Sequence, residues 1–162
     1  MGLAGAGKSE IATSVVKSLK VKEVPVVWLD GDEIRNSLSL VGHDPSTRFD
    51  VGKKLVNLSL LLNRQGYHVI LSSVGMRQSL DDYARQNVPY YRSILVNASV
   101  EFIKQLGRRP IYKDSTKNVV GKDLSPDNLI YNLKIENSKV GDLAHAIFAI
   151  ESFCLQEINW RN

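Results

Sequence analysis

The sequence predicts an α/β fold of three layers, in which helices cover both faces of a mainly parallel β-sheet. Apolar runs with the length of buried strands alternate along the chain with longer segments of helical periodicity. A glycine-rich loop at the start of the chain leads directly into a helix, as it does in proteins that bind phosphate groups. The 162 residues suffice for one domain and are too few for two, so we expect a single domain over 1–162.

The first half of the chain carries the clearest elements. A helix is predicted from Lys8 to about Leu19, because apolar residues recur there at helical spacing. Val24 to Leu29 is an apolar run followed by Asp30-Gly31-Asp32, the pattern of a buried parallel strand that ends in polar residues at the sheet edge. A long amphipathic helix over Ser46 to Arg64 and a strand over Tyr67 to Leu71 follow.

The second half continues the alternation of helices and strands. Between its elements, residues 107–127 are rich in charged and turn-forming residues without periodicity, which predicts a long, lid-like functional loop. The predicted elements are a helix over Gln78–Arg85, a strand over Ser93–Val96, a helix over Val100–Leu106, a strand over Asn128–Ile135 and a helix over Asp142–Ile158.

The glycine-rich loop from Gly2 to Ser9 matches the phosphate-binding P-loop pattern GxxxxGK[ST] at every defined position. The motif requires glycines so that successive backbone N–H groups can surround phosphate oxygens. Lys8 would neutralise the β- and γ-phosphates of ATP, and the Ser9 hydroxyl would bind Mg²⁺. A glycine-rich turn that carries Lys and Ser by chance is the alternative, and the helix behind the loop argues against it. The backbone of Gly2, Gly5, Ala6 and Gly7 is expected to contact the nucleotide.

The strand that should lead into this loop is nearly absent, because only Met1 precedes Gly2. In this fold that strand lies in the middle of the sheet, and its loss leaves neighbouring strands with unpaired backbone groups. We therefore expect a truncated first strand. Adding upstream residues, which should form a short β-branched run, is expected to raise the melting temperature and the affinity for ATP.

Two aspartates follow the first predicted strand. Phosphoryl transfer to a hydroxyl requires a carboxylate that can orient the hydroxyl and receive its proton. Asp32 is predicted to take this role and Asp30 to meet Mg²⁺ through water, although the two roles could be exchanged. A solvated turn that caps a helix is the alternative for this pair. The intact phosphate loop just upstream favours catalysis.

The order of these motifs resembles the adenylyl-sulfate (APS) kinase family. Its pattern of a P-loop, LDGDxxR, a further Arg, and a strand leading into a substrate loop is matched by Gly2–Ser9, Leu29–Arg35, Arg48 and Tyr67–Arg77. A weaker match to the family's NFTGID segment covers Asn118–Asp123. The resemblance implies phosphorylation by ATP of a hydroxyl, expected to be the ribose 3′-hydroxyl, of a 5′-modified nucleotide such as adenylyl sulfate. It also implies that a homodimer is an option.

The resemblance assigns Arg35 and Arg48 to an anionic nucleotide acceptor, and the substrate loop to Ser73 and Val74. For either arginine, a solvated position on a helix face is the alternative.

Arg108 and Arg109 lie in the lid-like loop, where a lid arginine can contact ATP and cover the transferring phosphoryl group. The alternative is that Arg108 and Arg109 are surface charges without a role in the site.

The resemblance breaks in the acceptor pocket. The family is expected to hold adenine between two phenylalanines, and His43 and Val119 occupy those positions here. Stacking on an aromatic contributes about 1–3 kcal/mol per base, so the loss of two aromatics argues against adenine. A relative, cytidine diphosphoramidate kinase, performs the same reaction on a pyrimidine nucleotide in surface-polysaccharide modification and is the alternative. His43 is a candidate acceptor contact, with a simple turn residue as the other interpretation.

The amino-acid composition favours some classes of binding partner over others. The formal charge of +4 comes from scattered Lys and Arg, which suits small anionic substrates and argues against nucleic acid. We expect neither a membrane span nor a leader segment, and the single Cys154, read as a buried thiol, fits a reducing cytoplasm. A non-catalytic nucleotide-binding module remains a second hypothesis, whereas the lack of an NKxD-type motif argues against a GTPase.

Overall fold

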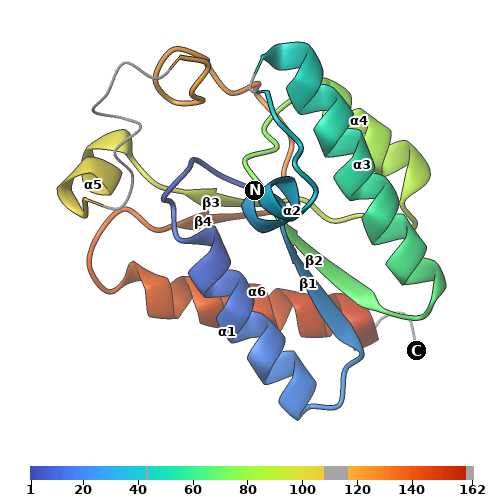
Figure 1. The fold of residues 1–162 in the computed structure, drawn as a ribbon. Helices are drawn as coiled ribbons and strands as arrows, with labels where there is room; N and C mark the ends of the chain where they lie inside the picture. Colours follow the sequence, from blue (N-terminus) through green and yellow to red (C-terminus); the bar gives the residue numbers. More distant parts are fainter. Residues whose placement is uncertain (43, 108–116, 160–162) are drawn as a thin grey trace.

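The computed structural model describes residues 1–42, 44–107 and 117–159 of the chain. Helices α1 and α6 lie together on one side of the strands, and α3 and α4 lie together on the other (Figure 1). This arrangement confirms the predicted three-layer α/β fold. The elements in chain order are α1 (Lys8–Val21), β1 (Val26–Asp30), α2 (Gly31–Ser37), α3 (Pro45–Arg64), β2 (His68–Ser72), α4 (Gln78–Asn87), β3 (Ile94–Asn97), α5 (Val100–Gln105), β4 (Leu133–Glu136) and α6 (Asp142–Asn159).

Side-chain caps decide where several helices begin. The carboxylate of Asp44 accepts a hydrogen bond from the Thr47 backbone N–H, which starts α3 at Pro45. Asp30 caps α2 in the same way, and this seven-residue helix was not predicted because it carries no apolar periodicity.

The predicted strand at Asn128–Ile135 is correct only in its second half, since β4 begins at Leu133. The residues before it form single backbone and side-chain hydrogen bonds instead of a continuous ladder, and the Asn132 backbone N–H donates to the Ser93 carbonyl at 2.9 Å. The Asn132 amide oxygen accepts from the Ser93 backbone N–H at 2.9 Å, and the Ile130 carbonyl accepts from Arg85 at 2.8 Å.

The strands form two separate parallel pairs. β1 pairs with β2 from Val26↔His68 to Asp30↔Ser72, and β3 pairs with β4 from Ile94↔Leu133 to Asn97↔Glu136. Within the part of the chain that the structure describes, no strand joins the pairs, and a slot separates β2 from β3. The sheet is therefore interrupted between β2 and β3.

A hydrophobic core cluster packs α1 and α6 against strands of both parallel pairs. Val15 and Ile103 are 0% exposed, and Leu19 is 1% exposed. Full burial of such side chains contributes about 1.5–3 kcal/mol each, so this cluster fixes α1 and the loop in front of it.

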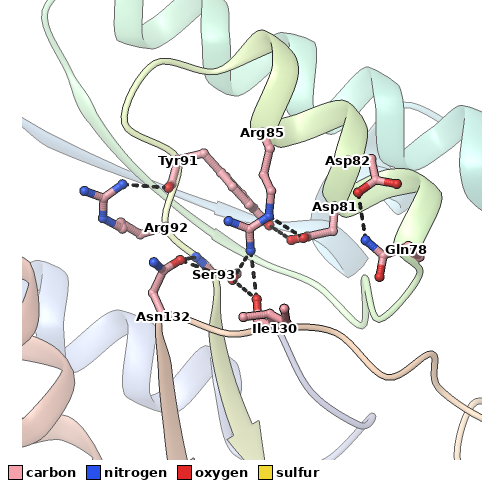
Figure 2. A network of polar contacts seen from close by, with 9 residues as sticks. All are labelled: Gln78, Asp81, Asp82, Arg85, Tyr91, Arg92, Ser93, Ile130 and Asn132. Carbon is pink, nitrogen blue, oxygen red and sulfur yellow. Dashed lines mark hydrogen bonds and ion pairs between the residues drawn. The ribbon is translucent and has the colours of Figure 1, made fainter.

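A polar network fixes α4 against the start of β3 and the segment before β4 (Figure 2). The Asp81 carboxylate, in a residue 3% exposed, accepts from Arg85 Nε at 2.6 Å and from the Tyr91 hydroxyl at 3.0 Å. Arg85 Nη2 donates further to Ser93 Oγ at 3.1 Å and to the Ile130 carbonyl. The buried carboxylate thus has the partners that make its burial tolerable.

Candidate active site

The phosphate loop turns through two left-handed glycines before α1 begins. Gly5 has φ +83° and Gly7 has φ +89°, a region that side chains rarely adopt. Gly7 is the N-cap residue of α1, so the first backbone N–H groups of the helix are directed at the space above the loop. The helix dipole makes this position favourable for an anion.

The base of the loop is anchored in the protein interior. A Cβ on Gly2 would lie 2.3 Å from the Val96 carbonyl oxygen, so this glycine permits the loop to approach β3. The Ala6 carbonyl accepts from Asn137 Nδ2 at 2.9 Å, and Asn137 is only 5% exposed. Gly2 and Ala6 therefore lie below the pocket surface, where Gly2 permits close packing and Ala6 anchors the loop.

Asp30 connects the phosphate loop to the carboxyl edge of the β1–β2 pair. Its Oδ2 accepts from Ser9 Oγ at 2.6 Å and from Ser72 Oγ at 3.0 Å. Its Oδ1 accepts from the Asp32 backbone N–H at 3.0 Å. Trp28 Nε1 donates to Ser72 Oγ at 3.0 Å, which orients that hydroxyl. Asp30 therefore caps α2 and contacts Ser9 at the phosphate loop at the same time. The helix-cap interpretation and the catalytic interpretation of this residue are compatible.

The pKa of Asp30 reflects opposing effects. Partial burial raises the pKa, but hydrogen bonds from Ser9, the Glu33 backbone, Ser72 and the Asp32 backbone together lower it by more, so the pKa lies below its ordinary value. Asp30 is consequently an anion throughout the neutral range.

One pocket of about 350 Å³ brings most of the predicted residues together. The Lys8 ammonium, on its floor, donates to the Leu3 carbonyl at 2.7 Å and thereby closes the loop. The exposed Asp32 and the substrate-loop residues Ser73 and Val74 line the same pocket. The lining residues are Gly5, Gly7, Lys8, Ser9, Glu10, Asp30, Asp32, Ser72, Ser73 and Val74.

Beside this pocket, three arginines lie close enough to influence one another. Arg48 is half-buried, and its Nη2 donates to the Asn118 carbonyl at 2.5 Å. Burial lowers the pKa of Arg48, and the positive charges of Arg35 and Arg77 lower it further. Clustered guanidinium groups of this kind are stabilised when an anion binds among them.

Arg77 was not among the site residues predicted from the sequence. Its Nη1 forms an ion pair with Asp127 Oδ1 at 3.0 Å, and Asp127 Oδ2 accepts from the Gln78 backbone at 2.8 Å. The available signal was its place three residues after Val74, just before α4. Arg35 donates to the Gly42 carbonyl, so it reaches toward the loop between α2 and α3.

Val119 packs into the core and is 5% exposed, so its side chain does not supply a stacking surface. Three further candidates, His43, Arg108 and Arg109, lie outside the described residues, as do residues 108–116 of the predicted lid-like loop.

No helix in the described ranges is long and apolar enough to cross a membrane. Within the same residues, no group of three or more His, Cys, Asp or Glu is arranged as a metal site.

A parallel α/β fold with a P-loop next to an acidic sheet edge is that of the P-loop nucleoside-triphosphate-binding proteins. Within that class the chain belongs to the adenylylsulphate kinase family, whose model matches residues 1–126. It is an ATP-dependent phosphotransferase of the APS kinase type that acts on small nucleotide substrates.

Two curated relatives and one solved structure illustrate the similarity. The cytidine diphosphoramidate kinase of Campylobacter jejuni is 32% identical over 141 residues, which cover 85% of this chain and 83% of the relative. The adenylyl-sulfate kinase of Gloeothece citriformis is 27% identical over 113 residues, covering 69% of this chain and 64% of the relative. The Mycobacterium tuberculosis APS kinase, solved with AMPPNP and APS, aligns at TM-score 0.83 and 19% identity over 93% of this chain and 92% of that one, which shows the shared fold.

Proposed function

We propose that the chain transfers the γ-phosphoryl group of ATP to the ribose 3′-hydroxyl of a nucleotide that carries a small anionic group on its 5′-phosphate, such as adenylyl sulfate. The observation that supports this proposal is a single pocket, which residues of the phosphate loop line together with Asp32, Ser73 and Val74. A phosphoryl donor and a hydroxyl acceptor can meet there.

The phosphate loop holds the donor. Backbone N–H groups around Gly5 and Gly7 and the start of α1 bind phosphate oxygens, and Lys8 neutralises the β- and γ-phosphates. On nucleotide binding the Lys8 ammonium exchanges its contact with the Leu3 carbonyl for the stronger one with phosphate.

Ser9 and Asp30 fit a magnesium ion. Mg²⁺ is commonly held by one or two protein oxygens together with substrate phosphates and water, and Ser9 Oγ and Asp30 Oδ2 lie 2.6 Å apart beside the loop. The low pKa keeps Asp30 ionised for this role. When bound, the ion neutralises charge on the transferring phosphate.

Asp32 acts as the base. Its exposed side chain follows the capped start of α2 and lines the same pocket as Lys8. The acceptor oxygen forms a bond to the γ-phosphorus, its proton passes to the Asp32 carboxylate, and the bond between that phosphorus and the ADP oxygen breaks.

The arginine cluster of Arg35, Arg48 and Arg77 binds the anionic end of the acceptor. Burial and, after it, the positive charges of Arg35 and Arg77 lower the pKa of Arg48, and a phosphate or sulfate group among the guanidinium groups would offset both effects. The cluster therefore selects a nucleotide with a charged 5′ substituent.

Cytidine diphosphoramidate is the second candidate acceptor. Two observations favour it, namely the core position of Val119 and the 32% identity to the Campylobacter jejuni enzyme. A pocket without an aromatic at this position suits a smaller pyrimidine base better than adenine.

The test is ADP release from ATP in the presence of single acceptors: adenylyl sulfate, cytidine diphosphoramidate, AMP and CMP. We expect one of the first two to stimulate release strongly, and phosphorus NMR of the product to place the new phosphate on the 3′-oxygen. ATP binding without stimulation by any acceptor would contradict the proposal and favour a non-catalytic module.

A further inference from the structure

A turn over residues 118–124 holds the guanidinium group of Arg48. Arg48 Nη2 donates to the Asn118 carbonyl at 2.5 Å, which joins the start of α3 to a segment 70 residues further along the chain. The Asn118 backbone has φ +60°, a left-handed conformation that residues other than glycine seldom adopt. The direction of this carbonyl therefore depends on the contacts that keep Asn118 in that conformation.

The carboxylate of Asp123 supplies those contacts. Its Oδ1 accepts from the Val119 backbone N–H at 2.5 Å, and its Oδ2 accepts from the Asn118 backbone N–H. Two successive N–H groups can converge on one anion only where the backbone between them is curled. The carboxylate therefore stabilises the curled conformation in which the Asn118 carbonyl meets Arg48.

Apolar side chains attach the same turn to the protein independently of Asp123. Val119 is 5% exposed and belongs to the core cluster, and Val120 is 7% exposed. Asp123 itself is exposed, so it contributes hydrogen bonds and not packing. Removal of its carboxylate should leave the turn attached to the core and release only the conformation of Asn118.

Arg48 requires such support because its surroundings disfavour a fixed position for its charge. Burial and the positive charges of Arg35 and Arg77 lower the pKa of Arg48, whereas the Asp123 and Asp32 carboxylates raise it by less. The hydrogen bond to the Asn118 carbonyl opposes movement of the guanidinium group away from the other two arginines. A guanidinium group that is already held in place loses less side-chain entropy when it binds an anion.

We propose that Asp123 is a positioning residue for the acceptor: through the Asn118 carbonyl, it holds the Arg48 guanidinium group in the place where the anionic group of the nucleotide binds. Asp123 acts through Arg48 and does not itself contact the reacting atoms. The inference rests on the acceptor role proposed above for Arg48. It assigns to the 118–124 turn a function in acceptor affinity that is separate from ATP binding.

The test measures the dissociation constants of ATP, adenylyl sulfate and cytidine diphosphoramidate by equilibrium titration, which requires no turnover. Asp123→Ala should raise the constant of whichever acceptor the unmodified chain binds more tightly by about tenfold, and that of ATP by less than about twofold. Asp123→Asn keeps one side-chain oxygen that can accept from the turn, so it should restore part of the lost affinity. Asp50→Ala is the matched control, since it removes an exposed carboxylate two residues after Arg48 on α3, and it should leave all three constants unchanged.

A double-mutant cycle tests whether Asp123 acts through Arg48. In the Arg48→Ala background, Asp123→Ala should change acceptor affinity by less than about twofold, because the group that it positions is gone. Equal losses in both backgrounds would overturn the inference, and so would unchanged acceptor affinity in Asp123→Ala where Arg48→Ala weakens binding. Unchanged affinity in Arg48→Ala would overturn the acceptor role of Arg48 as well. The expected pattern of affinities in a chain that releases no ADP with any acceptor would support the inference and contradict the proposed reaction.

Discussion

The hydroxyl of Ser9 donates a 2.6 Å hydrogen bond to Oδ2 of Asp30, across 21 residues of sequence. This bond joins the start of α1 to the end of β1 and places a hydroxyl and a carboxylate side by side at the mouth of the phosphate loop. It is the contact on which the proposed magnesium site rests.

Replacing Ser9→Ala removes the hydroxyl and leaves the loop backbone in place. We expect the Mg²⁺ concentration that gives half-maximal rate to rise by about 10–100-fold, because one oxygen near the ion is lost. Initial rates against Mg²⁺ at saturating ATP measure this. Ser14→Ala is the matched control, since the Ser14 hydroxyl donates only within α1, to the Glu10 carbonyl. Equal Mg²⁺ dependence in both variants would exclude Ser9 from the site.

Asp32→Asn keeps the shape of the side chain and removes its basicity. Turnover should fall by about 100–10,000-fold while the dissociation constant of ATP changes little. Lys8→Ala, in contrast, should reduce both turnover and ATP affinity. Stopped-time product assays and equilibrium titration separate these effects.

Glu101→Gln is the control for charge removal, because Glu101 is an exposed carboxylate in the first turn of α5. A normal turnover number in Asp32→Asn would assign the base elsewhere, with Asp30 as the next candidate.

Arg48→Ala should weaken acceptor binding specifically. The loss of a charge-assisted contact costs about 1.5–3 kcal/mol, so the KM for the acceptor should rise about 10–100-fold with the KM for ATP unchanged. Arg64→Ala, at the exposed end of the same helix, is the control. Parallel increases in both KM values would indicate a general distortion of the pocket instead of a role in acceptor recognition.

Asp81→Ala should destabilise the fold. It removes a buried acceptor from Arg85 and Tyr91, and because Arg85 is partly exposed we expect a loss of about 2–3 kcal/mol in the free energy of unfolding. Urea denaturation measures this loss. Asp82→Ala, at the neighbouring exposed position, should change the free energy by less than about 0.5 kcal/mol. Similar losses in the two variants would contradict the structural role of the contacts that Asp81 forms with Arg85 and Tyr91 in Figure 2.

The ionisation of Tyr91 should make the free energy of unfolding depend on pH in the alkaline range. Burial and the neighbouring Asp81 carboxylate raise the pKa of Tyr91 above its ordinary value near 10. The folded state therefore keeps the phenol proton after the unfolded state has lost it. The stabilisation is complete below pH 10 and declines by about 1.4 kcal/mol per pH unit above it.

Tyr91→Phe removes this titration, so its free energy of unfolding should fall less steeply above pH 10 than that of the unmodified chain. Urea unfolding at several pH values between 8 and 11 provides the comparison. Parallel curves for the two proteins would show that Tyr91 ionises alike in both states.

Local patterns in the sequence were sufficient for most of the secondary structure. The periodicity of apolar residues located α1, α3 and α6 within a few residues, since a helix buries one face whatever it packs against. The same reasoning missed α2, whose start depends on the Asp30 cap, and placed the beginning of β4 too early. There the residues before Leu133 form hydrogen bonds with Arg85 of α4 and with Ser93, just before β3, which no local pattern records.

The sequence by itself determined the phosphate loop and the pair Asp30 and Asp32, because each motif is continuous along the chain and its chemistry depends on spacing. Only the tertiary structure brought Asn137 to the Ala6 carbonyl, 131 residues away, and Arg77 to the other two arginines. It also decided that Val119 lies in the core and that a slot separates β2 from β3. The physical reason is that such contacts join residues from distant elements, and their geometry exists only once those elements have packed.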